Sequence, residues 1–323
     1  MKAIRIHKFG ATEEALQFDD IPVPEPRGDQ VLIQVEAAAL NRADLGLRRG
    51  TYRISPEELP VIPGREFAGP IAKVGPEVKT FTPGQRVVAY TGTGGYAEYA
   101  LAKVSEVCPL PDGMESVTAA VVPTVFLTAW FALLSEGKLK TGEWVLVQAG
   151  SSGVGMAAIQ IAKHVGAKVV ATSSGDEKCR RVRRLGADAV IDYTKTDFAA
   201  EVERVTGARG VDVVLEMIGG EVYRKSLETL APGGRLVSIG GAFGAIPDSP
   251  PALGGGRSAR RFSITNHLKA RPQDFGELAN ILKLVSEKKF QVVIDKVFPL
   301  ADARAAQRYL EAREHFGKIV LVP

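Results

Sequence analysis

The run from Trp144 to Gly155, Trp-Val-Leu-Val-Gln-Ala-Gly-Ser-Ser-Gly-Val-Gly, constrains the fold more than any other part of the chain. An apolar, β-branched stretch leads into clustered glycine and serine, and an alanine-rich segment with apolar residues at helical spacing follows. This order predicts a strand, a glycine turn and a helix. Backbone N–H groups at such a helix start attract a phosphate, although a tight turn without a ligand gives the same pattern. The predicted dinucleotide-binding turn comprises Gly150, Ser151, Ser152, Gly153, Val154 and Gly155.

Apolar, β-branched segments alternate with helical ones beyond this turn, which predicts a doubly wound parallel sheet. The expected strands are 145–148, 168–172, 189–191, 211–216 and 235–239, with helices at 155–165 and 177–185. A helix is expected at 118–134, an edge strand at 262–265 and a helix at 274–287, with a Gly- and Pro-rich loop at 241–258.

Residues 1 to about 122 read as short strands punctuated by glycine and proline, which favours a mostly antiparallel β domain. The chain is therefore expected to be α/β. Residues 1–122 and 291–323 are predicted to form a catalytic domain, and residues 123–290 a Rossmann dinucleotide-binding domain.

Composition excludes several classes of protein. Two cysteines and four histidines among 323 residues cannot make a disulfide scaffold, and they fit a reducing cytoplasm. The net charge of +4 comes without a long basic block or interleaved aromatic residues, so nucleic acid is not an expected partner. Neither a signal peptide nor an apolar run long enough to span a bilayer is apparent, so no membrane partner is expected.

Several separated motifs together resemble the zinc-free quinone oxidoreductases of the medium-chain dehydrogenase/reductase superfamily. The resemblance implies a partly open, β-barrel-like catalytic domain wrapped around an inserted Rossmann domain, with the active site between them. The motifs are Asn-Arg-Ala-Asp at 41–44, Pro-Gly-Arg-Glu-Phe-Ala-Gly at 63–69, Gly-Tyr-Ala-Glu-Tyr at 95–99, Leu-Thr-Ala-Trp at 127–130, the turn at 150–155, Leu-Gly-Ala-Asp at 185–188 and Gly-Lys-Ile-Val at 317–320.

The resemblance also predicts that no metal is held. The positions where zinc-dependent relatives carry Cys, His and Cys ligands correspond to Asn41, Arg65 and Thr124, which offer neither a thiolate nor an imidazole. The proton-relay hydroxyl of those relatives corresponds to Ala43. Arg65 has two interpretations, a contact to an anionic substrate group or an ion pair with Glu66 or another acid, and the ion pair is favoured.

The cofactor is predicted to be NADPH. NAD-binding proteins carry an acidic residue after the second strand, and here the matching position is Ser174. Lys178 supplies positive charge one helical turn later, unless it only belongs to a solvated helix face. Tyr193 matches a tyrosine that contacts the 2′-phosphate in NADPH-dependent relatives. Asp176 is the counter-signal, because a carboxylate that reached the ribose would favour NADH.

The remaining site residues follow from the resemblance. Thr128, Gly240, Phe243 and Lys318 are expected to contact the cofactor, with a bond back to a helical carbonyl as the alternative for Thr128.

Three residues of the first domain are candidates for catalysis. Asn41 is expected to donate to a substrate oxygen that gains charge. Asp44 either orients the substrate or caps the helical turn at 44–48. Tyr52 either donates a proton or stacks on the acceptor.

The predicted activity is hydride transfer from NADPH to quinones or activated alkenes. Two alternatives stay open. One is an enoyl-thioester reductase that uses the Arg257–Arg261 cluster to admit a CoA or phosphopantetheine arm, and the other is a non-catalytic NADPH-binding protein. A homodimer is expected to form through an edge strand at 261–268.

Overall fold

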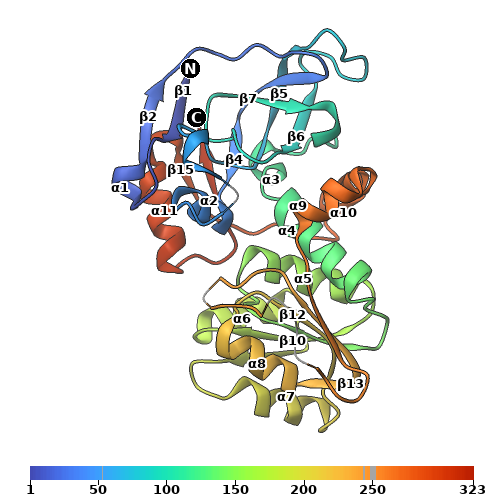
Figure 1. The fold of residues 1–323 in the computed structure, drawn as a ribbon. Coiled ribbons are helices and arrows are strands. Elements are labelled where there is room, and N and C mark those ends of the chain that lie inside the picture. Colours follow the sequence, from blue (N-terminus) through green and yellow to red (C-terminus); the bar gives the residue numbers. More distant parts are fainter. Residues whose placement is uncertain (53, 243, 248–251) are drawn as a thin grey trace. The chain divides into compact units, whose positions relative to one another are not determined.

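The computed structural model describes residues 1–52, 54–242, 244–247 and 252–323. The chain forms two compact units (Figure 1). The first comprises Met1–Thr124 and Gln273–Pro323, and the second comprises Val125–Pro272.

The second unit is built on a six-stranded sheet in the order β11-β10-β9-β12-β13-β14, with every pair parallel. Within this unit the first strand, β9, lies in the middle of the sheet. The chain adds β10 and β11 on one side and then β12, β13 and β14 on the other, so the predicted doubly wound Rossmann sheet is confirmed. Its strands are β9 (Trp144–Val147), β10 (Lys168–Ser173), β11 (Ala189–Asp192), β12 (Val211–Glu216), β13 (Leu230–Ser238) and β14 (Ser258–Arg261).

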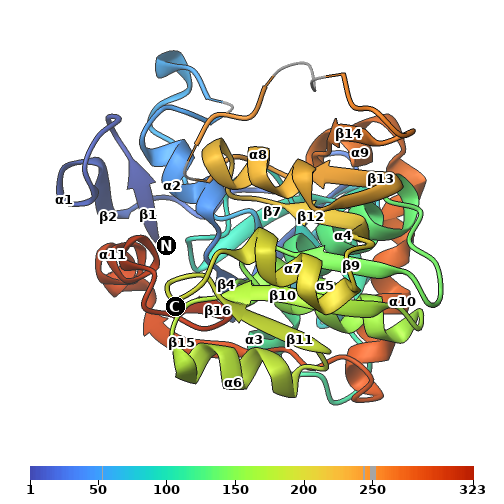
Figure 2. The ribbon, with the colours of Figure 1, turned by 90° about the horizontal axis from the view of Figure 1, so that it is seen from below.

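Helices cover both faces of this sheet, as the view in Figure 2 shows. The helices α5 and α6 follow β9 and β10, whereas α7 and α8 pack on each other and against the strands that they connect. The α-helices that lie wholly within the unit are α5 (Gly153–His164), α6 (Asp176–Arg184), α7 (Phe198–Thr206), α8 (Gly220–Glu228) and α9 (Ile264–Ala270).

The expected edge strand at 261–268 is wrong. The edge strand is β14, which ends at Arg261, and α9 begins at Ile264 after Ser263, whose hydroxyl accepts from the Asn266 N–H at 3.4 Å. A short apolar run such as this one has no period that separates a strand from a helix, and the serine cap decides for the helix.

The first unit holds an eight-stranded sheet in the order β15-β16-β4-β5-β3-β7, with β6 and β8 continuing from β5. Only β15 and β16 are parallel, so the predicted mostly antiparallel, partly open barrel is confirmed. The strands are β3 (Gln30–Gln34), β4 (Ala37–Ala39), β5 (Glu66–Val74), β6 (Arg86–Tyr90), β7 (Tyr99–Lys103), β8 (Val107–Pro109), β15 (Ile294–Pro299) and β16 (Lys318–Val322), with a separate antiparallel pair of β1 (Lys2–Ile6) and β2 (Leu16–Asp20).

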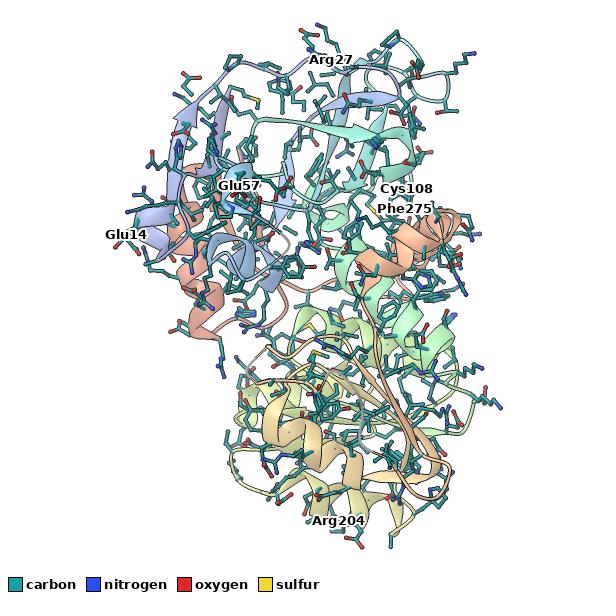
Figure 3. The ribbon with its side chains drawn as sticks, viewed as in Figure 1. Glu14, Arg27, Glu57, Cys108, Arg204 and Phe275 are labelled. Atoms are coloured by element: carbon teal, nitrogen blue, oxygen red, sulfur yellow. The ribbon has the colours of Figure 1, made fainter. Side chains whose placement is uncertain are left out.

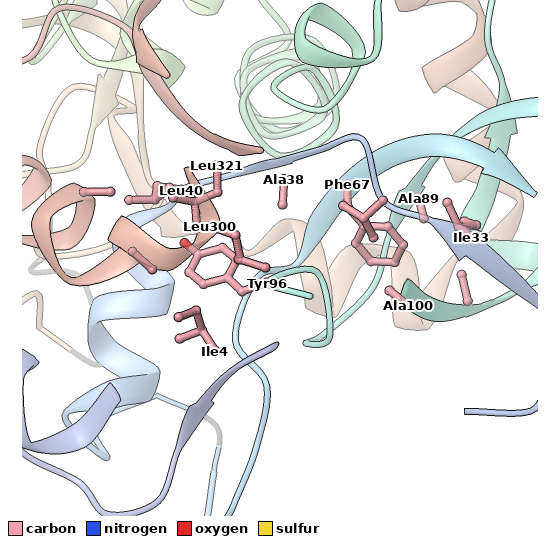
Figure 4. Close-up of a cluster of buried hydrophobic side chains, with 14 of the residues drawn as sticks. Ile4, Ile33, Ala38, Leu40, Phe67, Ala89, Tyr96, Ala100, Leu300 and Leu321 are labelled. Atoms are coloured by element: carbon pink, nitrogen blue, oxygen red, sulfur yellow. The ribbon is translucent and has the colours of Figure 1, made fainter. Parts of the chain in front are cut away.

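Side chains from both ends of the chain build the core of the first unit. Phe67, Tyr96 and Leu321 are completely buried in one cluster, which Figure 4 shows. The helices of this unit are α1 (Thr12–Ala15), α2 (Arg42–Arg48), α3 (Ser116–Ala119), α10 (Glu277–Ser286) and α11 (Ala303–Ala312).

The division of the chain differs from the expected one at its second boundary. Residues 273–290 were assigned to the Rossmann domain, but α10 contacts β8 and belongs to the first unit.

The segment Ser116–Glu136 is long and apolar enough to cross a bilayer, so the expectation of no such run is wrong by length and composition. It consists of α3, α4 (Pro123–Trp130) and a π-helical stretch, Phe131–Glu136. Of its most apolar window, 72% is buried inside the protein. This burial is typical of a core helix.

Candidate active site

The glycine turn after β9 is tightly fixed. The Gly150 N–H donates to the Thr172 carbonyl at 2.7 Å, and the Ala149 N–H donates to the Thr172 hydroxyl at 3.1 Å. A Cβ on Gly155 would lie 2.2 Å from the Ala149 carbonyl oxygen, so only glycine fits there. The helix α5 begins at Gly153, and the N–H groups of its first turn have no intrahelical acceptor. The turn therefore fits a dinucleotide phosphate.

Ser152 departs from the glycine pattern because it caps α5. Its hydroxyl oxygen accepts from the Gly155 N–H at 3.0 Å, and its hydroxyl lies 3.5 Å from the sulfur of Met217. The serine is thus engaged inside the protein, and the phosphate contact is left to backbone N–H groups.

The residues predicted to select the 2′-phosphate gather at the carboxyl edge of two neighbouring strands. Ser173 of β10 pairs in register with Asp192 of β11, so Ser174 and Tyr193 leave the sheet side by side. The Tyr193 N–H donates to the Ser173 carbonyl at 3.1 Å, and 52% of Tyr193 is exposed. Lys178 lies in α6, which contacts both strands.

Asp176, the acidic residue that would favour NADH, already has a cation partner. Asp176, the first residue of α6, accepts a hydrogen bond from the Lys195 ammonium at 2.5 Å. Its carboxylate therefore has a cation partner of its own, and the acidic residue that NADH selection needs is not free in this arrangement.

A buried ion pair links the two ends of the first unit. The Lys318 ammonium donates to the Leu40 carbonyl at 2.7 Å, to Asn41 Oδ1 at 2.7 Å and to Glu66 Oε1 at 3.0 Å. The Asn41 amide donates to the same Glu66 oxygen at 2.9 Å, and Glu66 Oε2 accepts from the Thr124 N–H at 2.7 Å. These bonds use all three N–H donors of the Lys318 ammonium. A contact of this side chain to the cofactor, as predicted, would therefore have to replace one of them.

This network also engages the predicted catalytic Asn41. Its amide makes one short bond to Glu66 and one long bond of 3.5 Å to the Ala39 carbonyl. Donation to a substrate oxygen stays a prediction, and the hydrogen on the long bond is the one available for it.

Of the two roles that the sequence left open for Asp44, substrate orientation and helix capping, the structure shows the helix cap. Its carboxylate accepts from the Asn41 N–H at 2.8 Å, at the start of α2, and from the Tyr96 hydroxyl at 3.0 Å. Burial raises the pKa of Asp44, although Arg65 and these hydrogen bonds oppose the shift.

The sequence favoured an ion pair of Arg65 with Glu66 or another acid. Glu66 is not that partner, and Asp44 is the acid that acts on Arg65 electrostatically. Arg65 lies just before β5, whose first residue is Glu66, and the carboxylate of Glu66 turns to Lys318 instead. The Arg65 guanidinium lies over the ring of Tyr52, 5.1 Å from its centroid. Burial opposes the charge of Arg65, but the electrostatic contributions of Tyr90, Asp44 and Tyr52 raise its pKa above the ordinary value, so it stays a cation.

Two buried polar atoms in this region have no hydrogen-bond partner among the residues that the structure describes, Arg65 Nε and Thr124 Oγ1. Both belong to positions that correspond to zinc ligands in zinc-dependent relatives. An amide, a guanidinium and a hydroxyl do not fit the ligands that zinc prefers. Within the described parts of the chain, no group of three or more His, Cys, Asp or Glu side chains could hold a metal ion.

The other predicted contacts lie on the elements expected of them. Thr128 is buried in α4, and no described residue forms a hydrogen bond with its hydroxyl to support the alternative bond back to a carbonyl. Gly240 follows β13, where a Cβ would meet open space. Phe243 lies outside the described residues.

Sequence reasoning missed Glu216, the last residue of β12. Its carboxylate is completely buried and accepts from the N–H groups of Ile218 and Gly219, at 2.6 Å and 2.8 Å, and from the Ser238 hydroxyl at 3.1 Å. It thereby shapes the turn after β12, at the sheet edge where ligands bind in such folds. An acidic residue at the end of a buried strand rich in Val and Leu was the available signal.

Comparison with known proteins gives two family matches. Residues 27–112 match the family described as alcohol dehydrogenase GroES-like domain, and residues 185–321 match the family described as zinc-binding dehydrogenase. Human quinone oxidoreductase is 37% identical over 327 residues, which cover 100% of this chain and 98% of that protein.

A longer relative is also similar. A phenolphthiocerol/phthiocerol polyketide synthase of Mycobacterium tuberculosis is 36% identical over 95% of this chain, but the chain spans only 14% of its length. Among solved structures, Escherichia coli quinone oxidoreductase complexed with NADPH superposes over 100% of both chains with a TM-score of 0.93 and 29% identity.

The two sheets, the glycine turn and these matches define a member of the medium-chain dehydrogenase/reductase superfamily. Within it, the chain belongs to the quinone oxidoreductase-type family.

Proposed function

We propose that the protein is an NADPH-dependent oxidoreductase that transfers hydride to quinones or activated alkenes without zinc. The observation that carries this proposal is the phosphate-binding turn at 150–155 together with Ser174 and Tyr193 at one sheet edge. The hydroxyl of a serine there can donate a hydrogen bond to a 2′-phosphate, whereas an acidic side chain would repel it. The human relative's name and the NADPH complex of the Escherichia coli protein support the same interpretation.

The side chains at the zinc positions support this choice of acceptor. Asn41, Arg65 and Thr124 supply no Lewis acid to stabilise an alkoxide, so alcohol oxidation lacks the usual support. Quinones and α,β-unsaturated carbonyls are already electrophilic and need less activation. When bound, the reduced nicotinamide supplies the hydride, and the chain's own residues bind and orient it.

The test is oxidation of NADPH and NADH, each followed by nicotinamide absorbance, with 1,4-benzoquinone, 9,10-phenanthrenequinone and 2-alkenals. We expect turnover with NADPH to exceed turnover with NADH, and treatment with a chelator to leave it unchanged. Absence of turnover with every acceptor would refute the proposal. Tight NADPH binding without any turnover would instead support the non-catalytic alternative.

An enoyl-thioester reductase is the second candidate, favoured by the match to the polyketide synthase. The basic cluster expected to guide a CoA arm is partly engaged, since Arg257 donates to the Ala231 carbonyl and Arg260 pairs with Glu136. Saturation kinetics with crotonyl-CoA, compared with a 2-alkenal, distinguish the two candidates.

We also propose that the protein is a cytoplasmic homodimer whose partners are otherwise small molecules. The strand β14 is the edge of the Rossmann sheet and could extend it across a two-fold axis. The chain has two cysteines in all, Cys108 and Cys179, which is the usage typical of a reducing compartment. Light scattering after size-exclusion chromatography tests the dimer, and a monomeric mass would refute it.

A further inference from the structure

Arg65 is a buried cation, and Asp44 favours its charge electrostatically without forming an ion pair with it. Only 7% of its surface is exposed, and none of the carboxylates in residues 1–52, 54–242, 244–247 and 252–323 forms an ion pair with it. The ring of Tyr52 lies against its guanidinium, and Arg65 Nε has no partner among the described residues. Removing such a charge from water is costly unless something compensates it.

The two neighbouring carboxylates make their hydrogen bonds elsewhere, although Asp44 still favours the charge of Arg65. The carboxylate of Glu66 is taken by the Lys318 ammonium, by the Asn41 amide and by the Thr124 N–H. The carboxylate of Asp44 is used at the start of α2 and by Tyr96. The charges of Lys318 and Glu66 neutralise each other, and the three donors of Lys318 are already used. Arg65 is therefore the cation in this region that can bind a negatively charged group of a ligand.

We propose that Arg65 binds the carbonyl oxygen of the acceptor and stabilises the negative charge that this oxygen gains during reduction. The inference rests on the proposed function and assigns to Arg65 the electrostatic task that zinc performs in zinc-dependent relatives. The hydroxyl of Thr124, also buried and unpartnered within the described residues, is a second donor for the same oxygen.

For an enone, the atoms and electrons of the step balance. The C4–H bond of the reduced nicotinamide breaks, and its electron pair forms a C–H bond at the β-carbon. The π electrons of the alkene and carbonyl shift onto the oxygen, which becomes an enolate held by the guanidinium. The nicotinamide is oxidised, the enone is reduced, and a proton from water completes the saturated ketone. A fixed donor aimed at the developing charge lowers the barrier of such a step.

The variants Arg65→Met and Arg65→Lys test the proposal by kinetics. The methionine removes charge and donors, and we expect kcat/KM for a 2-alkenal to fall on the order of 100-fold, as for loss of one oxyanion donor. The lysine keeps the charge and should recover part of the loss. The control Arg204→Met removes an exposed arginine that pairs with Glu201 on α7 (Figure 3), and its activity should match the wild type.

A binding measurement separates this inference from the proposed function. At a pH where 4-nitrophenol is ionised, the phenolate resembles the reduced oxygen, and its absorption spectrum reports binding with or without NADP⁺. We expect Arg65→Met to raise its Kd at least about tenfold, with NADPH affinity and melting temperature retained. If the variant binds the phenolate and turns over the alkenal as the wild type does, the role of Arg65 is refuted and the reductase function stands. If the wild type turns over no acceptor, the proposed function fails, while Arg65-dependent phenolate binding would still support an oxyanion site.

Discussion

Replacing Lys318 by methionine should destabilise the first unit strongly. The substitution removes an ammonium that donates three hydrogen bonds and leaves the carboxylate of Glu66 buried without its cation. The exposed fractions of the two side chains are 7% and 0%, so solvent cannot screen the loss. Breaking a buried pair by removing one partner costs about 3–5 kcal/mol. At about 2–4 °C per kcal/mol, the melting temperature should fall by roughly 6–20 °C.

The assay exploits the distribution of tryptophan. Trp130 and Trp144 are the two tryptophans of the chain, and both belong to the second unit. Urea unfolding followed by tryptophan fluorescence therefore reports the Rossmann unit, whereas circular dichroism reports both units. We expect Lys318→Met to shift a circular-dichroism transition to lower urea and to leave the fluorescence transition close to that of the wild type.

The matched control lies on the same strand as Glu66. Lys73 of β5 pairs with Glu25 at 2.8 Å with both side chains more than half exposed, so Lys73→Met should cost at most about 1 kcal/mol. The double variant Lys318→Met/Glu66→Gln should be more stable than Lys318→Met, because no charge remains buried. A loss for Lys318→Met no larger than that of the control would show that the pair does not stabilise the unit.

Three further outcomes are expected. Ser174→Asp should lower the preference for NADPH over NADH by roughly tenfold or more, measured as the ratio of the two kcat/KM values, because its carboxylate faces the 2′-phosphate; an unchanged ratio would contradict the assignment. Gly155→Ala should abolish NADPH binding in a fluorescence titration, since its Cβ would lie 2.2 Å from a carbonyl oxygen, whereas Gly254→Ala, with nothing within 4 Å, should bind normally. Burial raises the pKa of Glu216 above 4.5, so the folded state holds this proton more tightly and the wild type should lose stability relative to Glu216→Gln as pH rises above that value; parallel urea midpoints across the pH series would refute this.

Local patterns in the sequence predicted the Rossmann unit well. The strand β12, Val211–Glu216, was predicted at its observed bounds, because Val and Leu fill most of its positions, as is typical of a parallel strand buried on both faces. The glycine turn was equally visible, because its conformation depends on residues that are adjacent in the chain.

The site in the first unit could not be derived in this way. Arg65 was expected to pair with its neighbour Glu66 or another acid, but the carboxylate of Glu66 turns to Lys318 and the guanidinium of Arg65 lies over the ring of Tyr52. The true partner of Glu66 is Lys318, 252 residues further along, and only the folded sheet brings the two together. The role of Ser152 as a helix cap was also hidden, because a serine at that position reads equally well as a phosphate contact.

The position of β16 in the sheet determines which of the two units can complete its sheet first during synthesis. This strand lies inside the sheet, between β15 and β4, and carries Lys318 to its ion pair with Glu66. During synthesis, the first unit therefore stays incomplete until residues 318–322 are available, whereas every strand of the Rossmann sheet has been made by residue 261. All strands of the inserted unit are therefore available for folding while the first unit still lacks an interior strand, and until then β4 and β15 of the first unit have no β16 to pair with.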